Sequence, residues 1–154
     1  SVLVDNTSGV LNRVAGLFSR RGYNIDSLTV GVTQDPRYSR MTIVVTGDDD
    51  IIEQIIKQIE KLVDVNKVEV LEDNNSVCRE LILTKVKTTP EQRQQVMAVA
   101  DIFRAKIVDV GIDSLIIELT GNQNKLDAFL NLLADYEILE LVRTGITGLA
   151  RGTK

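Results

Sequence analysis

The sequence of 154 residues has no histidine, no tryptophan and a single cysteine, Cys78. Without histidine the chain lacks the commonest general base and a frequent metal ligand. One cysteine can form neither an internal disulfide nor a C-x-x-C metal site, and it favours a reducing compartment, the cytoplasm. No apolar run approaches the roughly 18 residues of a membrane span. The net charge of -4 argues against a nucleic-acid-binding protein, which would present a basic surface to phosphates.

The few residues that could carry chemistry have simpler explanations. The acidic run 48–50 could bind Mg²⁺, but at a helix start carboxylates interact favourably with the positive end of the helix dipole. Cys78 lies in a strand pattern with no histidine to activate it, which indicates a core thiol. Gly145, Gly148 and Gly152 have the wrong spacing for a phosphate-binding loop. We therefore predict no catalytic residue, no metal site and no cofactor in this chain.

Apolar periodicity in the first half predicts the order strand, helix, strand, strand, helix, strand. Aromatic residues are only 4% of the sequence, so valine, isoleucine and leucine must build the core. The expected strands are residues 3–5, 24–33, 39–46 and 65–71. The first helix begins near Gly9, ends at Gly22 and has an apolar face formed by Val10, Leu11, Val14, Leu17 and Phe18. The second helix opens with the run 48–50 and has the stripe Ile52, Ile55, Ile56, Ile59 and Leu62.

The same order returns after residues 73–76, a polar segment predicted to be a linker. Residues 89–92 read as a capping box with proline at the first helical position. The expected strands are residues 77–87, 106–110, 114–120 and one that ends near Val142. The inward residues of the two helices are Val96, Val99, Ala100 and Phe103, and then Leu126, Phe129, Leu130 and Leu133.

The two halves can be aligned by a constant shift of about 74 residues, which is the signature of a duplicated unit. The shift pairs Gly47 with Gly121, Ile52 with Leu126, Ile55 with Phe129, Ile56 with Leu130, Ile59 with Leu133, and Val68 with Val142. We therefore predict an α+β protein of two ferredoxin-like βαββαβ domains, residues 1–73 and 77–154.

The loop before the first helix is the best candidate for a binding site. Gly9 lets a ligand approach the backbone closely, and the free N–H groups of the first helical turn suit a carboxylate. The alternative is that Ser8 caps the helix and that glycine is merely tolerated beside it. The loop by itself does not decide between these two interpretations.

Several short segments of the sequence resemble the ACT domain, and more specifically the small subunit of acetohydroxyacid synthase (acetolactate synthase). In the first half they are Ser1-Val2-Leu3-Val4-Asp5-Asn6, Ser8-Gly9-Val10-Leu11, Arg13-Val14, Gly16-Leu17-Phe18-Ser19, Arg21-Gly22-Tyr23-Asn24-Ile25, Ser27-Leu28-Thr29-Val30, Ser39-Arg40-Met41-Thr42-Ile43 and Lys61-Leu62-Val63-Asp64-Val65. In the second half they are Arg79-Glu80-Leu81, Phe103-Arg104-Ala105-Lys106-Ile107-Val108-Asp109-Val110, Lys125-Leu126-Asp127-Ala128-Phe129, Arg143-Thr144-Gly145 and Gly148-Leu149-Ala150-Arg151-Gly152.

The resemblance implies a non-catalytic subunit that activates a catalytic partner and confers inhibition by valine or a related branched-chain amino acid. It also implies a homodimer formed through the ACT domains, with the amino acid bound at the interface. The effector residues carried over by resemblance are Asn6, Ser8, Gly9, Val10 and Leu11 of one chain and Asn24 and Ile25 of the other. Thiamine diphosphate, Mg²⁺ and FAD are expected in the catalytic partner.

The sequence leaves two alternative functions. An ACT-domain sensor could regulate a different enzyme, although such a protein should lack the segments of the second half that resemble the small subunit. An enzyme on a ferredoxin-like fold would show activity without any partner. The Gly-rich basic tail, which includes Lys154, also has two interpretations: a disordered terminus, or a segment that docks the catalytic subunit through Arg143 and Arg151.

Overall fold

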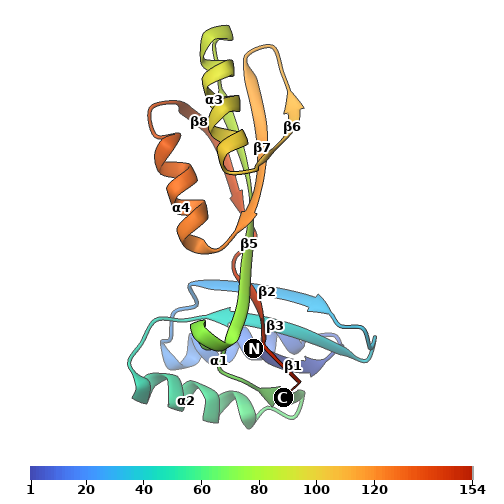
Figure 1. Ribbon diagram of the computed structural model, residues 1–154. Helices are drawn as coiled ribbons and strands as arrows, with labels where there is room; N and C mark the ends of the chain where they lie inside the picture. The colour runs from blue at the N-terminus through green and yellow to red at the C-terminus, as the bar shows by residue number, and fades with distance from the viewer. Residues whose placement is uncertain (154) are drawn as a thin grey trace. The chain divides into compact units, whose positions relative to one another are not determined.

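The computed structural model describes residues 1–153; Lys154, the last basic residue of the predicted tail, lies outside the described residues (Figure 1). By packing, the chain divides into two units. Unit 1 consists of Ser1–Cys78 together with the described residues from Ile146 onward, and unit 2 is Arg79–Gly145. The last residues thus pack with unit 1, whereas the sequence pattern assigned them to the second domain.

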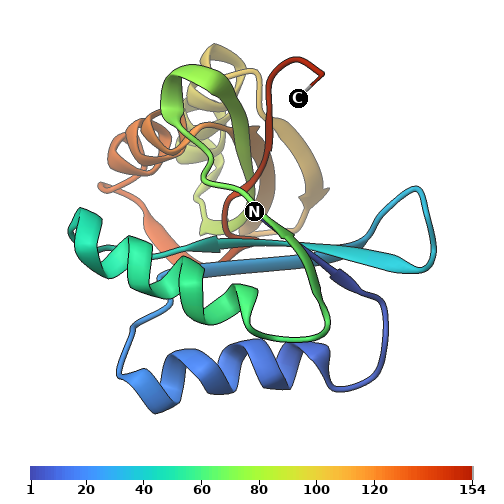
Figure 2. The ribbon, with the colours of Figure 1, turned by 90° about the horizontal axis from the view of Figure 1, so that it is seen from below.

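Unit 1 follows the predicted βαββαβ order. Its elements are β1 (Val2–Asp5), α1 (Val10–Arg21), β2 (Ser27–Val32), β3 (Tyr38–Val44), α2 (Asp49–Glu60) and β4 (Val65–Val68). The antiparallel sheet has the strand order β2-β3-β1-β4, so that β2 and β4 are its edges. Helices α1 and α2 lie side by side against this sheet (Figure 2). This is the ferredoxin-like arrangement expected for an ACT domain.

The core of unit 1 lies between the helices and one face of the sheet. Its buried members are Val2, Val4, Val10, Val14, Leu17, Phe18, Met41, Ile55 and Ile59. Because side chains alternate along a strand, Met41 points to the helices and its neighbour Thr42 points to the opposite face. Thr42 is nevertheless only 5% exposed. Something other than the helices must therefore cover the second face of this sheet.

Helix ends follow the local signals in the sequence. Gly22 has the left-handed φ of 72°, and its N–H donates to the carbonyl oxygens of Phe18 and Ser19, which ends α1. The Asp48 carboxylate accepts a hydrogen bond from the Ile51 N–H and caps α2, as the helix-start interpretation of the acidic run predicts. These signals depend on a few neighbouring residues, which is why the sequence reveals them.

Unit 2 repeats the same topology. After the 3-10 turn η1 (Asp73–Asn75) come β5 (Ser76–Lys87), α3 (Pro90–Ile102), β6 (Lys106–Val110), β7 (Ser114–Gly121), α4 (Gln123–Leu132) and β8 (Glu137–Arg143). The strand order β6-β7-β5-β8 is the counterpart of β2-β3-β1-β4. The capping box of α3 is present, with Thr89 and Gln92 each bonded to the other's backbone. Two ferredoxin-like domains are therefore confirmed.

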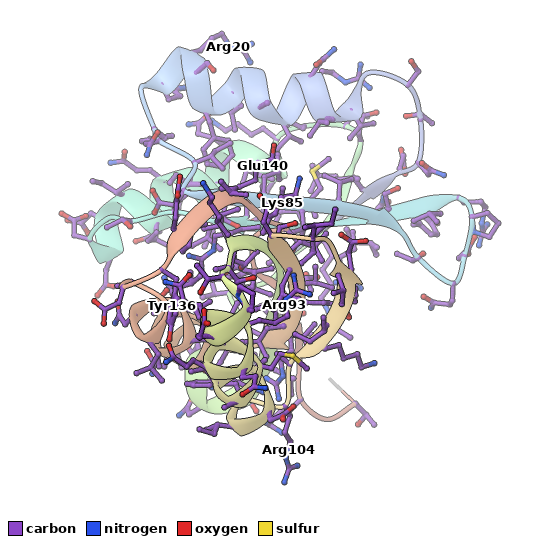
Figure 3. The ribbon with its side chains drawn as sticks, turned by 90° about the horizontal axis from the view of Figure 1, so that it is seen from above. Arg20, Lys85, Arg93, Arg104, Tyr136 and Glu140 are labelled. Carbon is purple, nitrogen blue, oxygen red and sulfur yellow. The ribbon has the colours of Figure 1, made fainter. Side chains whose placement is uncertain are left out.

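The core of unit 2 contains the repeat positions of the second half. Phe129 and Leu133 are fully buried, like Ile55 and Ile59 at the equivalent positions of α2. The last pair of the repeat behaves differently, because Val68 packs against its core whereas Val142 is 60% exposed. On β5 and β8, Lys85 and Glu140 form an exposed ion pair of 2.8 Å (Figure 3). The hydrogen bond between them lowers the pKa of Glu140 and raises that of Lys85.

Three details differ from the sequence expectation. Strand β2 begins at Ser27 rather than at Asn24, so that Asn24 and Ile25 belong to a loop. Leu11, expected on the buried face of α1, is 43% exposed. The tail forms a further strand, β9 (Thr147–Ala150), which pairs with β5. A disordered terminus is therefore wrong for β9, and a strand of four residues that contains a glycine has too weak a pattern to predict.

Candidate functional site

The loop between β1 and α1 is fastened to the β2–β3 turn through Asn6. The Asn6 backbone N–H donates to the Arg37 carbonyl at 2.7 Å, and its side-chain amide donates to the Pro36 carbonyl at 3.0 Å. The Ser39 hydroxyl donates to the Asn6 side-chain oxygen at 3.1 Å. Both ends of the Asn6 side chain are thus occupied within the chain. These bonds hold the loop against the β2–β3 turn and thereby fix where the residues that follow Asn6 begin α1.

The turn that holds Asn6 is itself stiffened by an ion pair. The Arg37 guanidinium donates to the Asp35 carboxylate at 2.7 Å, and this hydrogen bond keeps the pKa of Asp35 below its usual value. The Asp35 side chain also accepts from the Arg37 backbone N–H at 3.0 Å. Because Arg37 is exposed and Asp35 is only partly buried, the pair orients the turn carbonyls rather than stabilising the fold appreciably.

Gly9 stands at the N-cap of α1 with φ 86° and ψ -6°, a left-handed conformation that favours glycine. No side chain caps this helix, and its first turn contains no acidic residue. The interpretation in which Ser8 caps the helix is therefore wrong, and Ser8 is exposed beside the loop. The first N–H groups of a helix have no partner within the helix, so an uncapped start leaves donors for an anionic group.

Arg13 adds a positive charge to this helix start. A Cβ atom placed on Gly9 would lie 3.0 Å from Arg13 Nη1, which puts the guanidinium against the loop. The Arg13 Nε donates to the Asp64 carboxylate, which is mostly buried, and this contact orients the fork of the guanidinium. In the sequence, Arg13 belongs to one of the short segments that resemble the family, but the sequence pattern assigns no role to it. Its position four residues after Gly9, one helical turn away, is the signal that could have found it.

The two apolar residues at the start of α1 have different surroundings. Val10 is buried in the core at 3% exposure, whereas Leu11 is 43% exposed next to the loop. Val10 therefore anchors the helix start. Leu11 is the one available to contact the side chain of a small apolar ligand.

Asn24 and Ile25 lie at the other end of the same helix. They follow Gly22, the C-cap of α1, and Asn24 is exposed with its side-chain N–H on the Asp26 carboxylate at 3.2 Å. Ile25 packs against the core of unit 1. Twelve helical residues at about 1.5 Å each separate Gly9 from this pair by about 18 Å. One chain therefore does not bring the two predicted halves of the effector site together.

The two arginines predicted to dock the partner occupy different settings. Arg143 in β8 donates from Nε to Glu80 at 2.9 Å and pairs with the same carboxylate through Nη2. The Glu80 side chain is only 7% exposed. Arg151 is exposed, and its backbone N–H donates to the Asn75 carbonyl at 2.8 Å. Arg143 thus balances a buried carboxylate of its own unit, and Arg151 remains available for a partner.

The setting of Arg143 leads to a stability prediction. We expect Arg143→Gln to lower the free energy of unfolding by about 1–3 kcal/mol, because Glu80 would be left buried without its charged partner. Lys85→Gln is the matched control, since Lys85 joins the same two strands through an exposed pair with Glu140, and its effect should be near the limit of detection. Urea unfolding of both variants measures the difference. Equal losses would mean that the burial of Glu80 has no energetic consequence.

Two further features of the described residues bear on the sequence predictions, namely metal-binding side chains and Cys78. Among residues 1–153 no group of three or more side chains of the metal-binding types is close enough to hold an ion. Cys78 is half-buried, with its Sγ 3.8 Å from the Ser76 hydroxyl oxygen. Within the same residues no helix is both long and apolar enough to span a bilayer.

Comparisons with known proteins cover nearly the whole chain. A family described as the AHAS small subunit-like ACT domain matches residues 1–67, and one described as the small subunit of acetolactate synthase matches residues 79–152. The chain is 53% identical to the probable acetolactate synthase small subunit of Archaeoglobus fulgidus, over 100% of this chain and 96% of that protein. It is 49% identical to the acetolactate synthase small subunit of Mycolicibacterium smegmatis, over 100% and 91%.

A solved structure gives the same result for the fold. The crystal structure of the acetolactate synthase small subunit from Thermotoga maritima has a TM-score of 0.91 to this chain. Its sequence is 46% identical, and the similarity covers 99% of this chain and 96% of that chain.

Proposed function

Because this chain belongs to the acetolactate synthase small-subunit family, we propose that it is the non-catalytic regulatory subunit of that enzyme. It activates the catalytic subunit, and valine or a related branched-chain amino acid binds unit 1 and inhibits the assembly. The main support for the effector site is the start of α1, where no side chain caps the helix and Arg13 lies against Gly9.

The helix start suits the carboxylate of a free amino acid. Uncapped N–H groups and an oriented guanidinium are the donors that a carboxylate needs, and charge-assisted hydrogen bonds of this kind are the stronger ones. Leu11 then offers apolar contact to the ligand side chain. Each methylene in such a contact is worth about 1–3 kcal/mol, which rejects alanine but separates valine from isoleucine weakly. The expected effectors are therefore the branched-chain amino acids as a class.

Strand β2 offers the surface for a homodimer. It is an edge of the sheet among the described strands, and its sequence SLTVGV contains neither a charged residue nor a proline. Val30 and Val32 are 47% and 62% exposed. An uncharged apolar edge is prone to pair with another strand, and natural proteins usually protect such edges with lysine or proline. The opposite edge, β4, is short and carries Lys67.

Pairing of β2 with its copy would complete the effector site. A two-fold axis makes the paired strands antiparallel and does the same to the two α1 helices. Helix α1 connects β1 to β2 and so runs toward the paired edge. The start of α1 in one protomer then faces the end of α1 in its partner. This places Gly9 of one chain near Asn24 and Ile25 of the other.

We propose that thiamine diphosphate, Mg²⁺ and FAD are held by the catalytic subunit and that this chain holds none, acting in the cytoplasm. The sequence has no histidine, and the one run of carboxylates begins with a helix cap, Asp48. The family match over residues 79–152 also favours this subunit over a sensor that regulates another enzyme.

The proposal is tested by activity measurements on separated subunits. We expect the purified chain to form no acetolactate from pyruvate, to raise the activity of its catalytic subunit, and to make that activity sensitive to valine. A heat-unfolded sample of the chain is the control for unspecific protein effects. Pyruvate turnover by this chain after rigorous removal of the partner would contradict the non-catalytic role. A catalytic subunit whose activity and valine sensitivity do not change when the chain is added would contradict the regulatory role.

A further inference from the structure

Residues 146–150, which include β9, cover the second face of the unit 1 sheet; we call them the strap. The Ile146 N–H donates to the Ser27 hydroxyl at 3.0 Å, and the Thr29 hydroxyl donates to the Ile146 carbonyl at 3.4 Å. The Gly148 N–H donates to the Thr42 hydroxyl at 3.4 Å. These contacts explain why Thr42 is buried on the face that points away from the helices.

The strap reaches the strand that continues from the predicted effector residues. Ser27 and Thr29 belong to β2, and Ser27 is two residues after Ile25. On its other face β2 packs against the helices through Leu28. The position of β2, and with it that of Asn24 and Ile25, therefore depends on what lies on both faces of the sheet. Among the described residues, the hydrogen bonds of the strap to β2 and β3 are made by the neutral hydroxyls of Ser27, Thr29 and Thr42.

The strap follows directly on Thr144 and Gly145, the last two residues of unit 2. The Thr144 N–H donates to the Leu81 carbonyl at 3.0 Å, and the Thr144 hydroxyl accepts from the Leu81 N–H at 3.1 Å. Gly145 has φ 85°, a turn conformation that favours glycine.

We propose that the strap is a regulatory element. When it is bound to β2 and β3, it positions Asn24 and Ile25 for the effector, and effector binding in turn stabilises the strap in this bound position. The proposal rests on the effector site proposed above. It also predicts a linkage in both directions, because two ligands or elements that stabilise the same state must affect each other equally. Neutral hydroxyl contacts suit such a role, since they can be exchanged for water without leaving a buried charge.

A substitution at Gly148 can displace the strap from the sheet. It is buried, and a Cβ atom on it would stand 2.6 Å from Cys78 Sγ and 3.1 Å from the Val77 carbonyl oxygen. The carbonyl belongs to the backbone of β5 and cannot move aside as a flexible side chain would. Gly148→Ala should therefore push the strap away from Thr42.

The experiment measures valine binding and hydrogen exchange on the full-length chain. We expect Gly148→Ala to weaken valine affinity about tenfold, within the range of typical coupling between sites, and to speed exchange of the Ile146 and Gly148 amides. In the wild-type chain, valine should slow the exchange of the same two amides, which a purely structural strand would not show. Thr147→Ala is the matched control, because that side chain is exposed in the same strand.

A second variant covers the case in which Gly148→Ala does not fold. Ser27→Ala combined with Thr29→Val removes the hydroxyl contacts of Ile146 without adding bulk to the strap, and it should give the same weakening. Unchanged valine affinity in a folded variant whose strap amides exchange quickly would overturn the role of the strap and leave the effector site intact. A wild-type chain that binds neither valine, leucine nor isoleucine would overturn both proposals.

Discussion

Gly9→Asp is expected to abolish valine binding while the chain still folds and still activates its catalytic subunit. The new Cβ would stand 3.0 Å from Arg13 Nη1, so the added carboxylate would pair with Arg13 where the ligand carboxylate is proposed to bind. The loss of a charge-assisted hydrogen bond, about 1.5–3 kcal/mol, adds to repulsion between like charges, and together they should weaken binding at least about 100-fold. Calorimetry with valine measures this directly.

The stability of the Gly9→Asp chain should fall only slightly. Position 9 has φ 86°, and aspartate is one of the few residues besides glycine that adopts this region, at a cost of about 1 kcal/mol. Gly9→Asn is the matched control, because it has the same shape and the same backbone tolerance but no charge. It should weaken valine binding much less. If a folded Gly9→Asp chain keeps the wild-type affinity, the effector site lies elsewhere; if both variants weaken it equally, bulk rather than charge is responsible.

Asn24→Ala should reduce valine affinity, and mixing Gly9→Asp chains with Asn24→Ala chains should restore binding of wild-type affinity that neither variant shows alone. In the proposed dimer each site takes the Gly9 loop from one chain and Asn24 from the other. A heterodimer of the two variants therefore has one doubly altered site and one wild-type site. Random association of equal amounts makes half of the dimers mixed, so about a quarter of all sites should recover. Calorimetric stoichiometry after mixing gives this fraction.

The same geometry links valine binding to dimer formation. A ligand that contacts both chains binds the dimer and not the monomer, so valine should lower the dimer dissociation constant and dilution should weaken valine binding. Analytical ultracentrifugation with and without valine measures the first effect. A mixture that only averages the two variants, or a measurable dimer constant that valine leaves unchanged, would place each site within a single chain.

Much of the fold was predictable because its signals are local. The Asp48 cap, the capping box that begins at Thr89 and the stop at Gly22 each depend on residues within one helical turn. The alternation of apolar residues gave the strand and helix order of both halves, since each half repeats the same pattern of burial. The loop at Gly9 was also identified from the sequence, although with an open choice between a helix cap and a ligand site.

Contacts between distant residues decided what the sequence left open. The φ of 86° at Gly9 and the absence of a side-chain cap settle the choice against a Ser8 cap. Arg13 becomes part of the candidate site because Asp64, 51 residues later, orients it. Leu11 is 43% exposed because the core of unit 1 buries a narrower face of α1 than the apolar pattern of this helix suggests.

The C-terminal strap shows the limit of sequence reasoning most clearly. The sequence by itself determined two duplicated ferredoxin-like domains, a first loop suited to a carboxylate and a family resemblance over nearly the whole chain. It did not place residues 146–150, because their hydrogen bonds go to Ser27 and Thr29, which are 119 and 117 residues away. Local propensity has no information about such partners, and a four-residue strand is too short to show a period of its own. Only the tertiary structure could assign this segment to unit 1, because the hydroxyl groups that hold it are contributed by the sheet it covers.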